Sequence, residues 1–406
     1  MKESLYRVKE TVTVTLKDAR LSLQTGHVCI PSPVFITVDD CGFPRVYPDD
    51  LSTPEVGLET YESLLTLAKQ HHTRIVLAFT TRYLDRNNAS PCARPLPYLG
   101  KLMNLLKQNR QHLEIADHGW IHSHDNHIGE FYLVDERRPV SRHLQEQSVR
   151  RSASIYRSWG LEFPRVFVPP FGAFVPGVLD EILSQHGVEY LISTSPGQRD
   201  RLVPASANGD AGGDLALKGG IFWLPRSWLG VLAINTDLNR ALFTSMRREL
   251  LTVNRNGGAT PCRMTHIGNF LPHNRQRWQQ VFEYASKKPF LYLPRDIDQA
   301  VSQWLFLKYG SWRCHTTSES AVVLLDATRV PCRYAPHLGE VVVALRGSVQ
   351  YASSNGHQLR HRTVGDLTHV NVPIGTGAVQ RVAVVWPAQK GRALSQRPRE
   401  DGACIN

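Results

Sequence analysis

Short apolar runs alternate with amphipathic patterns through the first 310 residues. Runs typical of buried strands lie at 33–40, 73–81, 113–122, 165–172, 189–194, 220–225 and 262–268. Apolar residues three or four positions apart predict helices at 52–72, 98–111, 143–160, 176–188, 235–253, 275–288 and 294–310. At the first helix, Ser52 or Thr53 is a candidate N-cap and Pro54 suits the first turn. The alternation predicts a mainly parallel sheet covered by helices, either a barrel or a doubly wound layer.

The pattern changes after residue 316, where short strands separated by turn residues lie at 321–327, 339–347, 348–354, 367–373 and 380–387. We expect a small all-β module there, of the sandwich type. A Gly/Pro/Ser-rich stretch at 196–220 predicts a long surface loop. The predicted organisation is an α/β domain at 1–315, an all-β module at 316–388 and a disordered tail at 389–406.

Composition narrows the class of protein without identifying it. The 406 residues suffice for two domains. No apolar run approaches the ~18 residues of a membrane helix, and the N-terminal segment lacks the apolar core of a secretory signal, so we expect a cytoplasmic protein without a membrane span. Seven scattered cysteines without a CxxC pair indicate reduced thiols. The net charge of +11 is spread out without a nucleic-acid-binding motif, and we expect no nucleic-acid partner.

Two adjacent aspartates, Asp39 and Asp40, end the first buried strand in the segment FITVDD. Carboxylates are costly at the buried end of a strand unless they are paired or hold a metal. In α/β sheets, ligands gather at the carboxyl ends of the strands. The pair therefore suits a functional site, although it also suits a cap for the next element.

Four histidines follow the third predicted strand, in the segment EIADHGWIHSHDNH at 114–127. His118 and His122 are four residues apart, and His124 and His127 come directly behind them. Neutral imidazoles with a carboxylate are the usual ligands of a catalytic Zn²⁺. A lone histidine here would be structural, but four of them together with the strand-end aspartates favour a metal site.

Two further segments follow predicted strands. RVFVPPFGAF at 165–174 is a stiff turn, which either only connects two elements or presents the Phe171 N–H to a developing oxyanion. RMTHIGNF places His266 at a strand end, where it is either a core histidine or a general acid. Several aromatic residues suit either contact with a ligand or core packing: Trp120, Phe171, Phe174, Trp223 and Trp228.

The order and content of these segments resemble the polysaccharide deacetylase family, carbohydrate esterase family 4, whose shared unit is the NodB homology domain. The family's T-[FY]-D-D, H-x-x-x-H, R-x-P-[PY]-[FY]-G and [LI]-x-H segments read here as TVDD, HGWIH, VPPFGAF and MTH. The resemblance covers residues 33–310. It implies an irregular (β/α) barrel of the NodB type, to which the C-terminal all-β module is added.

The resemblance also implies a set of roles. A divalent metal would be held by Asp40, His118 and His122, with Zn²⁺ expected and Co²⁺ or Ni²⁺ as alternatives. Asp39 would be the base for a metal-activated water, and His266 would protonate the leaving amine. The metal and the Phe171 N–H would stabilise the oxyanion. Substrate contacts would come from Trp120, Pro170, Phe171 and Trp223.

The chain departs from the family pattern in two places. Val168 stands where the third segment normally has an arginine that orients the base, so Arg165 or Arg45 is a candidate substitute. The family's fourth segment, with an Asp and a Trp, has no clear counterpart, because WLPRSW at 223–228 lacks the acid. Asp237 is a candidate partner for His266.

Together with the residues that carry it, the resemblance implies a metal-dependent hydrolase that removes N-acetyl groups from an amino sugar in a polysaccharide or glycoconjugate. One alternative is hydrolysis of a small non-peptide amide on the same scaffold. A second is a catalytically silent carbohydrate-binding protein, which the presence of both aspartates and both histidines disfavours, since a silent site does not need four costly polar groups.

Overall fold

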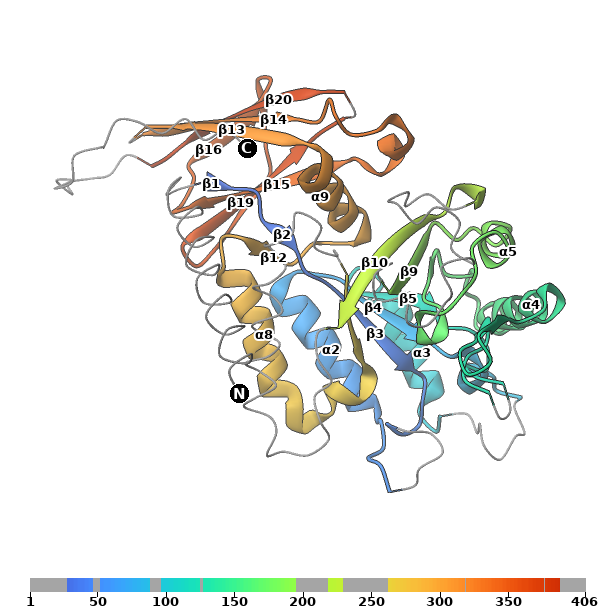
Figure 1. The fold of residues 1–406 in the computed structure, drawn as a ribbon. Coiled ribbons are helices and arrows are strands. Elements are labelled where there is room, and N and C mark those ends of the chain that lie inside the picture. The colour runs from blue at the N-terminus through green and yellow to red at the C-terminus, as the bar shows by residue number, and fades with distance from the viewer. Residues whose placement is uncertain are drawn as a thin grey trace, which may run out of the picture.

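A computed structural model gives the structure of residues 28–46, 52–87, 96–124, 127–194, 218–228, 262–317, 319–375 and 377–387. A barrel with surrounding helices packs against a β-sandwich (Figure 1). No helix in these ranges is long and apolar enough to cross a membrane. The predicted helix at 235–253, the tail at 389–406 and most of the predicted loop at 196–220 lie outside the described residues.

Seven parallel strands close into the barrel in the order β10-β11-β3-β4-β5-β8-β9. They are β3 (Phe35–Cys41), β4 (Ile75–Phe79), β5 (Leu113–Asp117), β8 (Val166–Phe167), β9 (Tyr190–Thr194), β10 (Phe222–Trp228) and β11 (Cys262–His266). The surrounding helices are α2 (Leu58–His71), α3 (Leu99–Gln108), α4 (Arg142–Ser158), α5 (Leu179–Ser184) and α8 (Arg275–Lys287). The predicted (β/α) barrel is therefore confirmed, and the doubly wound alternative is wrong.

Helix α2 begins later than the sequence predicts. Its first residue is Leu58, and Gly57 occupies the N-cap position without a side-chain hydrogen bond. Residues 44–46 and 54–56 pair antiparallel before the helix, because the Val46 N–H donates to the Pro54 carbonyl and the Val56 N–H donates to the Pro44 carbonyl. The predicted cap at Ser52 or Thr53 and the place of Pro54 in the first turn are therefore wrong.

The interior of the barrel is apolar at the end where the strands begin. Side chains alternate along a strand, so Phe222, Leu224 and Arg226 of β10 share one face. The first two belong to a core cluster that also contains inward residues of β4, β5, β8 and β9. The same cluster includes Trp304 and other residues of α9 (Ile297–Tyr309), together with the interior of the sandwich. Helix α9 thus joins the barrel and the sandwich in one continuous core.

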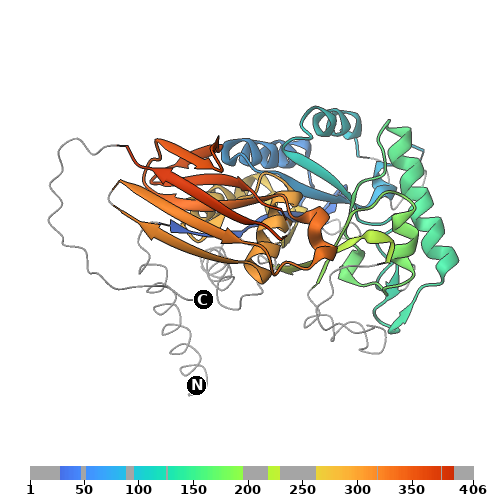
Figure 2. The ribbon, with the colours of Figure 1, turned by 90° about the horizontal axis from the view of Figure 1, so that it is seen from above.

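The C-terminal module is all-β, as predicted, and consists of two antiparallel sheets beside the barrel (Figure 2). One sheet contains β1 (Val28–Cys29), β15 (Glu340–Arg346), β19 (Leu367–Pro373) and β18 (His361–Val364). The other contains β13 (Ser311–Thr316), β14 (Ser320–Asp326), β20 (Val379–Val385), β16 (Tyr351–Ser354) and β17 (His357–Gln358). The boundary placed after residue 315 falls within β13, and β1 comes from the opposite end of the chain. The division into domains stays a prediction.

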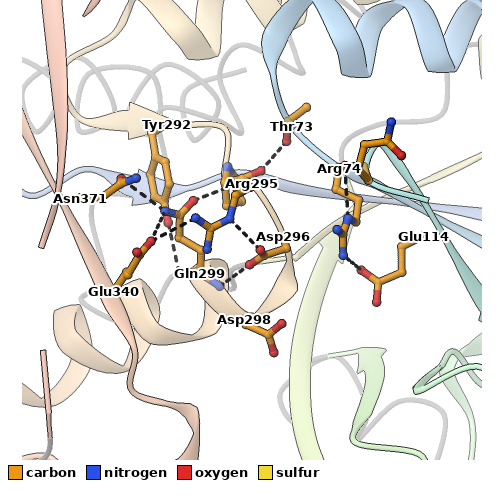
Figure 3. Close-up of polar contacts among 12 residues, drawn as sticks. Thr73, Arg74, Glu114, Tyr292, Arg295, Asp296, Asp298, Gln299, Glu340 and Asn371 are labelled. Carbon is orange, nitrogen blue, oxygen red and sulfur yellow. Dashed lines mark hydrogen bonds and ion pairs between the residues drawn. The ribbon is translucent and has the colours of Figure 1, made fainter. Parts of the chain in front are cut away.

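Polar contacts reinforce the junction between α9 and the sandwich (Figure 3). Arg295, just before α9, lies 3.4 Å from Glu340 of β15, and the Gln299 side chain donates to both Glu340 and Asn371 at 3.4 Å. One turn further along, the buried Gln303 amide donates to the Val342 carbonyl at 3.1 Å and accepts from the Val342 N–H at 2.6 Å. Buried amides are costly without such partners, so α9 and β15 depend on each other.

Ending the chain after Gly310 is expected to prevent the barrel from folding. The truncation exposes the apolar face of α9 and leaves the Gln303 amide without its β15 partners. We expect insoluble protein, or a soluble fragment without a cooperative thermal transition, measured by expression yield and circular dichroism. The control ends after residue 388, which removes only the predicted tail and should leave the melting temperature unchanged. A 1–310 fragment that melts cooperatively would show that the barrel is independent of the sandwich.

Candidate metal centre

The carboxyl ends of β3, β5 and β11 bring the predicted site residues to one end of the barrel. Asp39 and Asp40 lie at the end of β3, His118 directly follows β5, and His266 is the last residue of β11. The β3–β4 register shifts between Val38 and Cys41, and Asp40 has a left-handed φ of 60°. Such a bulge changes the direction of a side chain next to a site.

Asp40, His118 and His122 converge. The Nε2 atoms of His118 and His122 lie 3.5 and 3.3 Å from Oδ1 of Asp40. One ligand atom from each residue lies within 4.8 Å of the others. Nε2 of His266 is 3.6 Å from the second oxygen, Oδ2. The structure therefore brings together the three predicted metal ligands and the predicted acid, whose roles stay predictions.

The environment of His118 suits a metal ligand. Its Nδ1 donates to the Val168 carbonyl at 2.6 Å, which fixes the ring and makes Nε2 the atom with the lone pair when the imidazole is neutral. Nε2 is buried, and Oδ1 of Asp40 lies 3.5 Å from it, at the limit of a hydrogen bond. A buried nitrogen with so distant a partner is poorly compensated, and a cation would relieve that cost. Two imidazole nitrogens and one carboxylate form a donor set that fits a divalent ion such as Zn²⁺.

The charges at this centre are strongly coupled. Burial opposes ionisation of Asp40, but hydrogen bonds from His118 and His122 outweigh it and hold the pKa of the carboxyl well below its usual value. Burial likewise lowers the pKa of His118, but the charge of Asp39 and the hydrogen bond to Asp40 more than offset it, so the pKa lies above its usual value. The Asp40 carboxylate thus stays ionised beside the two imidazoles, which suits a cation.

Left-handed backbone at non-glycine residues is concentrated around the centre. His122 has a φ of 69° and Phe171 a φ of 57°, in addition to Asp40. Such conformations are uncommon outside glycine and cluster at functional sites. The Phe171 ring lies 4.7 Å from the His122 ring, and Phe171 is 40% exposed. Phe171 therefore lies at the edge of the centre, while the predicted oxyanion contact of its N–H stays a prediction.

Asp39 is held by a residue that sequence reasoning missed. Nη1 of Arg226 in β10 donates to both carboxylate oxygens of Asp39, at 2.9 and 2.7 Å. The exposed fractions are only 2% for Asp39 and 1% for Arg226. Arg226 therefore holds the carboxylate predicted to be the base, the part that the family pattern gives to an arginine at the position of Val168. The signal in the sequence is an arginine in the middle of a predicted buried strand.

The two arginines suggested as substitutes lie elsewhere. Arg165 pairs with Glu114 and with Asp298, each at 2.9 Å, on the side of the barrel where β8 begins. Arg45 pairs with Glu55 in the segment before α2. Both suggestions are therefore wrong as the partner of Asp39.

The remaining candidates do not all reach the centre. Trp223 is buried and packs against Phe174 with ring centroids 5.9 Å apart, in a core that includes α5. The Arg151 guanidinium lies over the Trp120 ring, with its Cζ 4.0 Å from the ring centroid. Further along the same loop, Nδ1 of His127 lies 3.1 Å from Asp135. Pro170 is buried within the turn, and Nε2 of His124 contacts the Glu130 carbonyl. Asp237 and the Trp228 side chain lie outside the described residues.

Comparison with known proteins gives structural likeness at low sequence identity. No model of a protein family matches the chain. No curated protein matches it in sequence. The chain is similar to a solved structure from Mycobacterium smegmatis assigned as a polysaccharide deacetylase, with 12% identity over 65% of this chain and 87% of that one and a TM-score of 0.43.

Two further solved structures belong to carbohydrate esterase family 4. The enzyme from Streptomyces lividans, in complex with acetate, is 13% identical over 62% of this chain and 88% of that one, with a TM-score of 0.33. A pseudoenzyme from Bacillus anthracis is 9% identical over 62% and 61%, with a TM-score of 0.34. The solved structures to which this chain is similar thus include a family 4 carbohydrate esterase and a pseudoenzyme of the same family.

Proposed function

We propose that this protein is a metal-dependent hydrolase that removes N-acetyl groups from an amino sugar in a polysaccharide or glycoconjugate. One observation supports this activity above all: two imidazole nitrogens and a carboxylate oxygen converge where three barrel strands end. Beside them lie a carboxylate held by a buried arginine and a third imidazole. A base, an acid and a cation site in one place are the groups that amide hydrolysis needs.

A divalent cation at Asp40, His118 and His122 would polarise the acetamide carbonyl and acidify a water molecule. Asp39, fixed by Arg226, would accept the proton from the attacking water. The C–N bond then breaks and acetate leaves. His266, whose side chain is 31% exposed, would give a proton to the departing amine nitrogen. Phe171 at the edge of the centre would offer its N–H to the oxyanion.

The direct test measures acetate released from N-acetylated chitooligosaccharides by purified protein with Zn²⁺, Co²⁺ or Ni²⁺. We expect release that depends on the added metal and disappears in Asp39→Asn, which keeps the shape of the base but not its basicity. A panel of small non-peptide amides is assayed in parallel. Turnover of the amides alone would favour the small-amide hydrolase. Stoichiometric metal without turnover of either class, in the presence of glycan binding, would favour the silent binding protein.

A further inference from the structure

A buried carboxylate lies beneath the loop that carries His122. Glu130 is 1% exposed and follows that loop in sequence. Its Oε1 accepts from the Trp120 N–H at 2.9 Å, and its Oε2 accepts from the N–H groups of Ile121 and His122 at 3.2 and 2.9 Å. The Ser148 hydroxyl of α4 donates to Oε1 as well. Three successive main-chain N–H groups of the loop therefore donate hydrogen bonds to one carboxylate.

The loop is shaped around this carboxylate. Gly119 has a left-handed φ of 81°, and a Cβ at that position would lie 2.1 Å from Oε2 of Glu130. The carbonyls on the other side of the loop are also bound, because the Thr81 N–H donates to Gly119 and the Arg82 N–H donates to Trp120, both at 2.9 Å. The main chain of the loop is thus fixed from two sides.

Each of the three candidate ligands is supported differently. His118 is held through its own ring by the Val168 carbonyl, and Asp40 is placed by the bulge in β3. His122 has an unfavourable left-handed backbone, and its N–H is bound directly by Glu130. Among the described residues, the donors to the Glu130 carboxyl are N–H groups of the loop and the Ser148 hydroxyl of α4.

We infer that Glu130 is a positioning residue that keeps His122 in the orientation needed to bind the metal. This inference rests on the proposed function, because it takes Asp40, His118 and His122 as the ligand set. Glu130 does not touch the metal position itself. It acts through the backbone of one ligand, so its loss should weaken metal binding while all three ligands remain.

The test is Glu130→Gln, which keeps the shape but replaces one accepting oxygen by an amide NH₂ that faces N–H donors. We expect the affinity for Zn²⁺, measured by competition with a chromophoric chelator, to fall by ~10–100-fold, the usual effect of changing a group that orients a ligand. The Co²⁺ absorption spectrum of the variant should shift toward that of His122→Ala. Glu146→Gln changes a partly exposed glutamate of α4 that is paired with Arg142; it is the matched control and should leave the affinity unchanged.

The melting temperature of each variant is measured on the same samples. The Zn²⁺ affinities are compared at a temperature well below the melting transition of every variant. A lower melting temperature with unchanged Zn²⁺ affinity and an unchanged Co²⁺ spectrum would overturn the inference and leave the proposed function intact. If wild-type protein binds no stoichiometric metal, the proposed function fails first, and the inference fails with it. If Glu130→Gln does not fold, Ser148→Ala removes one donor from the same carboxylate and should lower the affinity several-fold. An unchanged affinity there would also overturn the inference.

Discussion

Replacing His118 by alanine is expected to abolish metal binding and acetate release while the barrel stays folded. The change removes the imidazole whose Nδ1 is fixed by Val168 and whose Nε2 faces Asp40. Only two of the three candidate ligands remain, so the loss should exceed the ~100-fold typical of changes to groups around a ligand. Metal content of dialysed protein, circular dichroism and acetate release measure the three properties separately.

His127→Ala is the matched control for this prediction. His127 lies in the same histidine-rich stretch but is paired with Asp135 and Glu136, away from Asp40. This variant should keep stoichiometric metal and full turnover. Full activity in His118→Ala would remove His118 from the ligand set. Metal lost from His127→Ala and kept in His118→Ala would instead place the ion at the His127 group, whose three side chains also lie close enough to share a cation.

Replacing Arg226 by leucine is expected to lower both stability and activity strongly. The variant leaves the Asp39 carboxylate buried without its cationic partner. Removing one member of a buried ion pair typically costs ~3–5 kcal/mol, because the remaining charge is no longer compensated. Without the two hydrogen bonds from Nη1, the carboxylate also loses its fixed orientation toward the centre. Chemical denaturation gives the change in the free energy of unfolding, and acetate release gives the change in activity.

A double variant separates the two effects. Asp39→Asn combined with Arg226→Leu removes both charges, so part of the lost stability should return, whereas activity should stay absent because asparagine is no base. Arg226→Lys keeps a positive charge without the planar guanidinium and should be intermediate in both measurements. Wild-type stability and turnover in Arg226→Leu would contradict the assignment of Arg226 as the residue that holds the base.

The parts of the fold that could be predicted are those that a local pattern determines. The β4 sequence IVLAF is buried at every position, and such a run can only be a strand or helix of the interior. The convergence of Asp40, His118 and His266 followed from the rule that strand carboxyl ends share one edge. Strand β13 escaped prediction because its side chains are half-buried or exposed and carry a polar pattern.

The residues that support the centre could not be predicted, because their contacts are distant in sequence. Arg226 is 187 residues from Asp39, and no pattern around it indicates which carboxylate it meets. Glu130 binds N–H groups, which every non-proline residue carries, so the sequence gives no sign of the pairing. Trp223 shows how ambiguous an aromatic residue is in a sequence, since a ring suited to stacking on sugars is equally suited to the core that it occupies.

The first and the last strand that the structure describes both lie in the sandwich. Strand β1 starts at Val28, and the final strand, β20, ends at Val385 in the neighbouring sheet (Figure 1). The candidate metal centre lies at the other end of the barrel, where β3 and β11 finish. Attaching the protein to a bead or sensor surface at either of these strand ends should therefore leave the mouth of the barrel turned toward the solution.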